Sequence, residues 1–228
     1  MDYDYPTKIK LLEYLMSFVS EERKRRFDEI IKYRTRHITL VLEDIYQPHN
    51  ASAILRTCDL TGVQDVHIIE NKNKYEVNPE VALGSSKWLT LKKHNSKDEN
   101  TLEAINSLKN SGYTVVATTP HEKAMDLDSL PINNKLAILF GTELTGLSEL
   151  AIKSADINLC IPMFGFTESY NISVSAALVL FNLTQRLRAS TIEWKLTNNE
   201  LTDLLLDWAR NSINKHELME QHFLNNLI

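Results

Sequence analysis

Three polar segments of the chain combine residue types that could hold a ligand or move a proton. The first runs from residue 43 to residue 59, where Asn50 and Arg56 follow an apolar run. On a helix that begins at Asn50, its amide and the guanidinium of Arg56 would lie on roughly the same side, about two turns apart. The structural alternative makes Asn50 a helix cap and Arg56 a surface charge.

The second segment, residues 139–148, contains two glycines in the spacing G-x-x-x-x-G, at Gly141 and Gly146. Leu147 stands where the phosphate-binding P-loop needs a lysine, so the segment disfavours a nucleotide triphosphatase. Glycines allow a backbone to pass close to a ligand, and Glu143 between them offers a carboxylate to a hydroxyl, an amine or a cation. The alternative is a tight turn between a strand and a helix.

The third segment, residues 161–175, mixes small polar and apolar side chains between an expected strand and a long expected helix. Such a mixture is costly unless the polar groups find partners. Backbone N–H groups at the start of the helix could bind a carboxylate or another ligand. In the alternative interpretation, Ser169 or Asn171 only caps the helix.

The elements that must position these segments alternate between strands and helices. Apolar runs predict strands over residues 38–43, 66–70, 113–118, 136–140 and 157–161. Helical spacing predicts helices near residues 51–61, 99–110, 148–154 and 172–188, with Gly112 at a helix end that favours positive φ. This order predicts an α/β fold with a parallel sheet and helices on both faces, in which ligands bind at the carboxyl ends of the strands.

Helical patterns also flank this core. The spacing predicts helices over residues 6–19, after an N-cap at Ser20, and over residues 197–227. We therefore expect a helical extension at 1–36, a core domain at 37–190 and a second helical extension at 191–228.

Charge and composition constrain the partners. The chain has 228 residues, of which 43% are hydrophobic and 24% charged, as in compact globular proteins. A net charge of −5 argues against nucleic-acid binding, because phosphates attract Lys and Arg. The basic residues are clustered, however, and could form a local RNA surface or simply solvated helix faces. The candidate RNA-binding residues are Arg23, Arg25, Arg26, Arg34 and Arg36.

Several classes of protein are disfavoured. The sequence has no signal-peptide pattern, no apolar run of membrane-spanning length and no G-x-G-x-x-G fingerprint of a dinucleotide oxidoreductase. Cys58 and Cys160 lack the spacing of a metal site, so we expect reduced thiols, no metal and a cytoplasmic protein.

Taken together, the three segments resemble the three motifs of the SpoU/TrmH family of RNA 2′-O-ribose methyltransferases, in the SPOUT class. Asn50, Ala53 and Arg56 match the element Asn-x-x-Ala-x-x-Arg, and residues 141–146 and 161–175 match the other two motifs. The resemblance extends from about residue 36 to residue 188. It implies a C-terminal trefoil knot, S-adenosylmethionine as the cofactor and a homodimer.

The resemblance also implies roles for individual residues. The catalytic group would comprise Arg56, Asn50, Glu143, Ser169 and Asn171. The cofactor would be bound by Thr118, Phe140, Gly141, Gly146, Ile161, Met163 and Tyr170, the last at a position where many members have Leu. In the family the arginine accepts the proton of the ribose hydroxyl. Because free arginine titrates far above neutral pH, Arg56 could instead fix the adjacent phosphate while water takes the proton.

The implied substrate is tRNA. Ribosomal-RNA members often carry an additional N-terminal RNA-binding domain, whereas only about 36 residues precede the first expected strand here. Short helical extensions are typical of the members that methylate a guanosine in the D-loop of tRNA. Two alternatives stay open, a ribosomal-RNA methyltransferase of the same family and an RNA-binding protein of this fold without catalytic activity.

Overall fold

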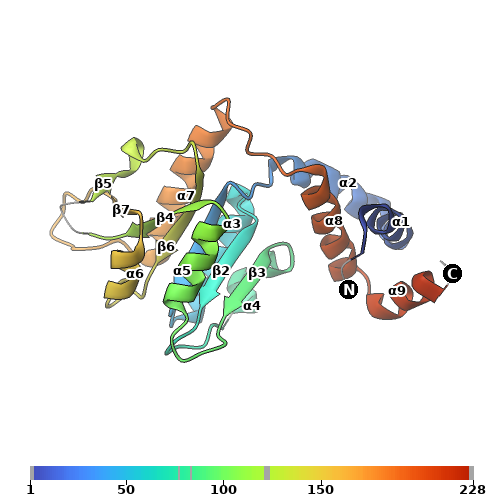
Figure 1. Ribbon diagram of the computed structural model, residues 1–228, viewed down its shortest axis with the longest axis horizontal. Helices are drawn as coiled ribbons and strands as arrows, with labels where there is room; N and C mark the ends of the chain where they lie inside the picture. The colour runs from blue at the N-terminus through green and yellow to red at the C-terminus, as the bar shows by residue number, and fades with distance from the viewer. Residues whose placement is uncertain (1–2, 77, 83, 121–123, 226–228) are drawn as a thin grey trace. The chain divides into compact units, whose positions relative to one another are not determined.

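The computed structural model describes residues 3–76, 78–82, 84–120 and 124–225. The chain divides into two compact units (Figure 1). One is an α/β unit from Thr35 to Trp194. The other combines the two ends of the chain, Met1–Arg34 and Lys195–Ile228, and is helical.

The α/β unit is built on a seven-stranded sheet in the order β3-β2-β1-β6-β4-β7-β5, with every pairing parallel among the described residues. Its strands are β1 (Ile38–Glu43), β2 (Asp65–Ile69), β3 (Thr90–His94), β4 (Tyr113–Thr118), β5 (Met125–Asp126), β6 (Lys135–Phe140) and β7 (Ile157–Cys160). Because all strands run in the same direction, their carboxyl ends lie along one edge of the sheet.

Helices bury both faces of the sheet, which is why its central strands read as continuous apolar runs. On one face, Leu40 and Leu42 of β1 pack in a core with the buried side chains of α3 (Pro48–Thr61) and α7 (Ile172–Arg188). On the other face, Val41 packs with α5 (Thr101–Asn110) and α6 (Glu149–Ser154). The prediction of a parallel α/β sheet is confirmed.

The element predictions were incomplete at the margins of the sheet. Strands β3 and β5 were missed, since β3 has the polar edge sequence Thr-Leu-Lys-Lys-His and β5 has only two residues. The short elements α4 (Pro79–Ala82), η1 (Ile31–Tyr33), η2 (Ser85–Lys87) and η3 (Leu127–Ser129) were also not predicted. Gly112 has a φ of 82°, which confirms its predicted role at the end of α5.

Helix α3 corrects one detail that matters for the site. It begins at Pro48 with Gln47 as its N-cap, so Asn50 lies inside the first turn and is not the cap that we expected. Proline favours the first turn of a helix because its missing N–H needs no partner there. The side chain of Asn50 is thus available for contacts outside its own helix.

The helical unit brings the two ends of the chain together. It contains α1 (Tyr5–Met16), α2 (Glu21–Ile30), α8 (Asn198–Ser212) and α9 (His216–Asn225), and α1 packs against both α8 and α9. Leu11, Leu15 and Trp208 are buried in it. Ser20 accepts a hydrogen bond from the Arg23 N–H, as predicted for an N-cap. Residues 226 and 227, which we expected to be helical, lie outside the described residues.

Candidate active site

The side chain of Asn50 joins all three sequence segments at the carboxyl edge of the sheet. Its Nδ2 donates to Glu143 Oε1 at 2.6 Å, and its Oδ1 accepts from Asn171 Nδ2 at 3.2 Å. Nδ2 also donates to Gln47 Oε1 at 3.0 Å. Asn50 is only 3% exposed, whereas Glu143 is partly buried and Asn171 is exposed. Residues far apart in the sequence therefore form one connected hydrogen-bonded group.

Asn171 has two roles that the sequence presented as alternatives. It is the N-cap of α7, because its Oδ1 accepts from the Ser173 N–H at 2.8 Å and from Ser173 Oγ at 2.6 Å. Its Nδ2 simultaneously donates to Asn50. The start of the long helix is thereby tied to the start of α3.

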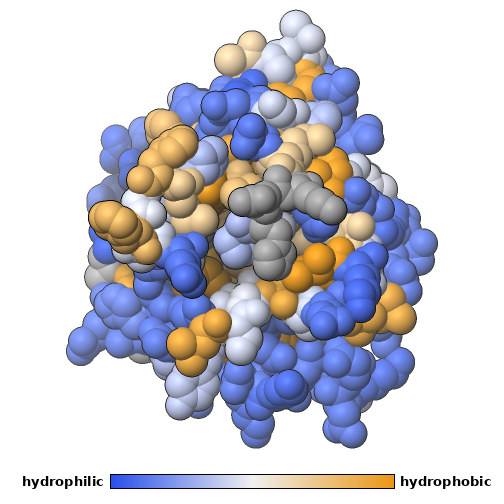
Figure 2. Space-filling view, turned by 90° about the vertical axis from the view of Figure 1, so that its left-hand side faces the viewer, coloured by the Kyte–Doolittle hydropathy of each residue, from blue (hydrophilic) through white to orange (hydrophobic). Residues whose placement is uncertain are grey.

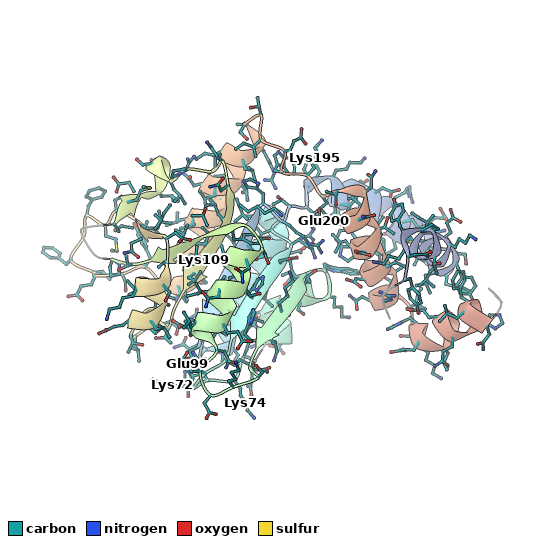
Figure 3. All side chains as sticks on the ribbon, viewed as in Figure 1. Lys72, Lys74, Glu99, Lys109, Lys195 and Glu200 are labelled. Atoms are coloured by element: carbon teal, nitrogen blue, oxygen red, sulfur yellow. The ribbon has the colours of Figure 1, made fainter. Side chains whose placement is uncertain are left out.

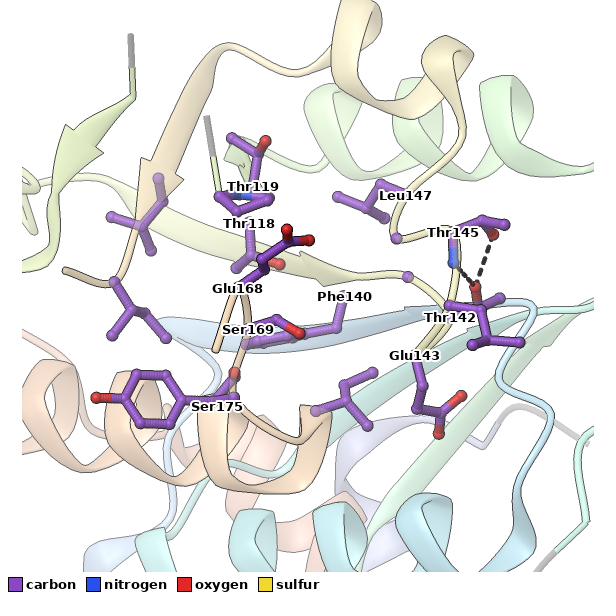
Figure 4. Close-up of a pocket in the computed structure, with 18 of the residues that line it drawn as sticks. Thr118, Thr119, Phe140, Thr142, Glu143, Thr145, Leu147, Glu168, Ser169 and Ser175 are labelled. Atoms are coloured by element: carbon purple, nitrogen blue, oxygen red, sulfur yellow. Dashed lines mark hydrogen bonds between the residues drawn. The ribbon is translucent and has the colours of Figure 1, made fainter. Parts of the chain in front are cut away.

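A cavity of about 330 Å³ opens beside this group (Figure 4). It is lined by the segments that follow three neighbouring strands of the sheet, β4, β6 and β7. All seven expected cofactor residues line it, namely Thr118, Phe140, Gly141, Gly146, Ile161, Met163 and Tyr170. Glu143 and Ser169 line it as well, whereas Asn50, Arg56 and Asn171 do not belong to its wall.

Sequence reasoning missed other residues of the wall. The additional lining residues include Thr119, Thr142, Leu147, Glu168, Ile172 and Ser175. Figure 4 shows Glu168 and Ser169 beside Thr118 and Phe140. The missed residues are sequence neighbours of predicted ones, so extending each motif by a few positions would have found them.

The turn between Gly141 and Gly146 forms one wall of the cavity and is unusually tight. Backbone hydrogen bonds join Thr142 and Gly146 in both directions, at 3.0 and 3.1 Å. The hydroxyls of Thr142 and Thr145 lie 2.8 Å apart. A Cβ atom at Gly141 would come within 2.1 Å of the Gly146 backbone, and Gly146 has a φ of 68°. Gly141 therefore has no room for a side chain, and Gly146 adopts a backbone conformation that favours glycine.

Arg56 lies apart from the buried group. Its side chain is exposed on α3 and forms no hydrogen bond or ion pair with another residue of the described ranges. The Glu143 carboxylate, for which the sequence left a hydroxyl, an amine or a cation as possible partners, accepts from the Asn50 side-chain amide. The guanidinium therefore remains accessible to a ligand from solution.

The five arginines proposed for RNA contact fall into two groups. Arg23, Arg25 and Arg26 are exposed on α2. Arg34 is only 2% exposed and lies 5.4 Å from the centre of the Trp208 ring, and the Arg36 Nε donates to Asp65 at 3.0 Å. Burial makes Arg34 structural, which corrects the expectation that it belongs to an RNA surface. The side chain of Arg36 is 19% exposed and is paired with Asp65.

Neither a metal-binding cluster nor a membrane-spanning helix is found among the described residues. Within the described ranges, no group of three or more His, Cys, Asp or Glu side chains is arranged to hold a metal ion. None of the described helices has the length and apolarity needed to cross a bilayer. Cys58 and Cys160 are free thiols.

Comparison with known proteins assigns the chain to a family. Residues 37–181 match the model of the SpoU rRNA Methylase family. The tRNA (guanosine(18)-2′-O)-methyltransferase of Borreliella burgdorferi is 45% identical over 93% of this chain and 95% of that protein. The enzyme of the same name from Thermus thermophilus is 39% identical over 84% of this chain and 97% of its own length.

A solved structure agrees with this assignment. The crystal structure of the A. aeolicus TrmH/SpoU tRNA modifying enzyme superimposes with a TM-score of 0.76 at 28% identity, covering 86% of this chain and 98% of that one. The likeness thus includes the α/β unit with its three motif segments and extends beyond it. The chain belongs to the SpoU methylase family.

Proposed function

We propose that this chain transfers a methyl group from S-adenosylmethionine to the ribose 2′-hydroxyl of a guanosine in the D-loop of tRNA. The observation that carries the proposal is the meeting of the three motif segments at Asn50, beside a cavity lined by the second and third segments. Family membership supports the methyl transfer. Two relatives named as tRNA (guanosine(18)-2′-O)-methyltransferases support the nucleotide.

The residues of the cavity fit S-adenosylmethionine. A volume of about 330 Å³ lies within the range of small-molecule sites. Apolar side chains such as Phe140, Leu159 and Ile161 suit an adenine ring, and nearby threonine and serine hydroxyls suit a ribose. Glu143 and Glu168 add negative charge where a cofactor with a sulfonium and an ammonium group would bind. When bound, the cofactor supplies an electrophilic methyl group.

The residues of the chain would position the ribose hydroxyl and handle its proton. Asn50, which is hydrogen-bonded to Glu143 and Asn171, would help to position the ribose beside the cavity. Ser169 would hydrogen-bond the ribose or the cofactor from the wall of the cavity. Because Asn50 is hydrogen-bonded to residues of the two other segments, we expect the site to be preorganised for its substrate.

For Arg56 we favour the phosphate-anchoring role over the role of general base. Its guanidinium is exposed and pairs with no carboxylate of the described ranges, so it is available for a bidentate bond to an RNA phosphate. The proton of the 2′-hydroxyl would then pass to water. A lysine cannot form the same planar bidentate bond, so Arg56→Lys should be impaired as well.

We propose that residues 37–190 form the methyltransferase domain, that the N-terminal extension at 1–36 contacts tRNA, and that 191–228 is a second helical extension. Support comes from the exposed arginines of α2, Arg23, Arg25 and Arg26. A local basic surface binds phosphates even in a chain with a net charge of −5. We also propose that the protein acts in the cytoplasm, in keeping with its free thiols.

We further propose a homodimer. Helix α7 exposes Val174, Leu178 and Phe181 at 45%, 42% and 62%, although its other face is buried in the core. Their spacing of four and three residues forms one apolar stripe, which is unfavourable in water without a partner. Figure 2, which faces the side of the molecule at which β5 lies in Figure 1, shows further apolar side chains among hydrophilic ones.

The trefoil knot is part of the same proposal. The cavity is lined by the segments after β4, β6 and β7, which a chain threaded between neighbouring strands would bring together. Agreement in fold with the A. aeolicus enzyme supports this topology.

Transfer of a tritiated methyl group to purified RNA fractions, followed by mapping of the product, tests the proposed function. We expect tRNA to be labelled at one D-loop guanosine, and a transcript with 2′-deoxyguanosine at that position to stay unlabelled. Labelling of ribosomal RNA alone would favour the first alternative. Binding of tRNA without any binding of S-adenosylhomocysteine would favour the non-catalytic alternative.

A further inference from the structure

A buried carboxylate that has no role in the proposed chemistry lies at the carboxyl end of β1. Glu43 is 3% exposed. Its Oε1 accepts from Thr101 Oγ1 and from Ser148 Oγ, each at 2.7 Å, and its Oε2 accepts from the Ser148 N–H at 2.8 Å. Burying a carboxylate is costly, and three short hydrogen bonds offset that cost only when all the donors are held in place.

One arm of this group fixes the end of the Gly141–Gly146 turn. Ser148 follows the turn by two residues and is the N-cap of α6, where its Oγ accepts from the Ala151 N–H at 3.1 Å. Glu43 therefore holds both the backbone and the side chain of the residue two positions beyond the turn. Leu147, between that residue and the turn, lines the cavity.

The other arm connects Glu43 to the loops after β2 and β3. The Thr101 hydroxyl accepts from Asn71 Nδ2 at 2.9 Å, and Asn71 Oδ1 accepts from the Asn100 N–H at 2.8 Å. In Figure 3 the labelled Lys72 and Lys74, which follow β2, lie near Glu99, which precedes α5. The Glu43 carboxylate is thus linked by hydrogen bonds to the loops that follow β2 and β3.

Asp44, the next residue, adds further hydrogen bonds at the end of β1. Its backbone adopts a φ of 54°, and its Oδ1 accepts from the N–H groups of Asn71 and Lys72 at 2.7 and 2.8 Å. Aspartate is among the residues that adopt a left-handed backbone most readily. The end of β1 is therefore connected by several hydrogen bonds to the loop after β2.

We propose that Glu43 is a positioning residue, which holds the Gly141–Gly146 turn in the shape that binds the methyl donor. This inference rests on the proposed function, because the turn forms a wall of the proposed cofactor site. Glu43 acts through Ser148 and does not itself line the cavity. Loss of its carboxylate should affect the cofactor and leave tRNA binding intact.

The test compares Glu43→Gln with a matched control, Asp65→Asn. Asp65 is also a buried carboxylate, 1% exposed, but it lies at the amino end of β2 and pairs with Arg36 and Lys92. We expect Glu43→Gln to weaken calorimetric binding of S-adenosylhomocysteine about tenfold, since a neutral amide cannot accept all three bonds. Asp65→Asn should lower the melting temperature and change that affinity by less than about twofold.

Steady-state kinetics add a readout that a general loss of stability would not move. For Glu43→Gln, KM for S-adenosylmethionine should rise about tenfold while KM for tRNA stays within about twofold. Ser148→Ala removes only one hydroxyl and should also weaken cofactor binding. This variant provides a second test if Glu43→Gln does not fold.

The outcomes separate the inference from the function on which it rests. If wild-type protein does not bind S-adenosylhomocysteine, the proposed function fails. If wild-type protein binds and both Glu43→Gln and Ser148→Ala bind equally well, the function stands and the positioning role is refuted. Equal weakening by Asp65→Asn would also refute it, because the effect would then follow from lost stability.

Discussion

The two edges of the sheet each bury a carboxylate but use it differently. At the amino edge, Asp65 pairs with Arg36 Nε at 3.0 Å and Lys92 Nζ at 2.6 Å. At the carboxyl edge, the donors to Glu43 among the described residues are two hydroxyls and a backbone N–H. Long charged side chains can reach a carboxylate in varied geometries, whereas a backbone N–H is directional and fixed in place. The amino edge thus holds elements together, and the carboxyl edge also determines the shape of a turn.

This difference predicts that substitutions at the carboxyl edge of the sheet lower methyl transfer. Substitutions elsewhere in the sheet should instead lower the free energy of unfolding. The largest expected effect is that of Arg56→Ala, which should lower methyl transfer on the order of 1,000-fold, because the ribose hydroxyl is poorly positioned once the adjacent phosphate loses its anchor. Binding of S-adenosylhomocysteine should stay within about twofold, since Arg56 does not line the cavity. Transfer of tritiated methyl groups and calorimetry measure the two quantities. Normal activity in this variant would refute its assignment.

The second prediction concerns the strands away from the cavity. Burial, with a contribution from Lys92, lowers the pKa of His67 on β2 from 6.5 to about 4. The unfolded chain therefore binds more protons between these values. Stability from neutral His67 is complete above about pH 6.5 and decreases as the pH falls towards 4, by at most roughly 3 kcal/mol.

His67→Phe should remove this part of the pH dependence. Its Nδ1 lies 2.9 Å from His94 Nε2, with the rings stacked, so an aromatic substitute preserves the packing. Urea unfolding of both proteins at pH 7 and pH 4.5 measures the difference. Parallel loss of stability in the two proteins would contradict the prediction, as would a defect in methyl transfer at pH 7.

The third prediction concerns the junction of the three segments. Asn50→Ala removes the bonds to Glu143, Asn171 and Gln47 and should lower kcat about 30-fold. A matched control is Asn182→Ala on α7, whose exposed amide donates to Asp128 at 2.8 Å, away from the junction. Equal activities of the two variants would show that the junction is structural.

The smallest expected effect concerns RNA binding. Replacing Arg23 and Arg25 together with alanine should weaken tRNA binding about tenfold and reduce the slope of log affinity against log salt by about 1.5. Filter binding at several salt concentrations measures both values. Replacement of Arg36, which is paired with Asp65, should leave the slope unchanged. A similar change of slope in both variants would contradict the assignment of the surface to α2.

Much of the fold was predictable because its central elements have strong local patterns. The bounds of β1, β4 and α7 agree with the predicted ranges, since their apolar periodicity persists over most of their length. Edge strands are a harder case, because β3 is half exposed and its lysines carry no strand signal. The seven cofactor candidates line one cavity because the motif glycines and the strand ends determine that edge locally.

The sequence by itself determined which residues could perform the chemistry and on which elements they lie, because residue type and periodicity are local properties. Only the tertiary structure decided how these residues are connected. In the folded chain, Asn50 is hydrogen-bonded to Glu143 and Asn171, and Glu43 accepts hydrogen bonds from Ser148. Arg34 is buried beside the Trp208 ring. These contacts join residues far apart in the sequence, and they depend on strand order and register, which no single segment encodes.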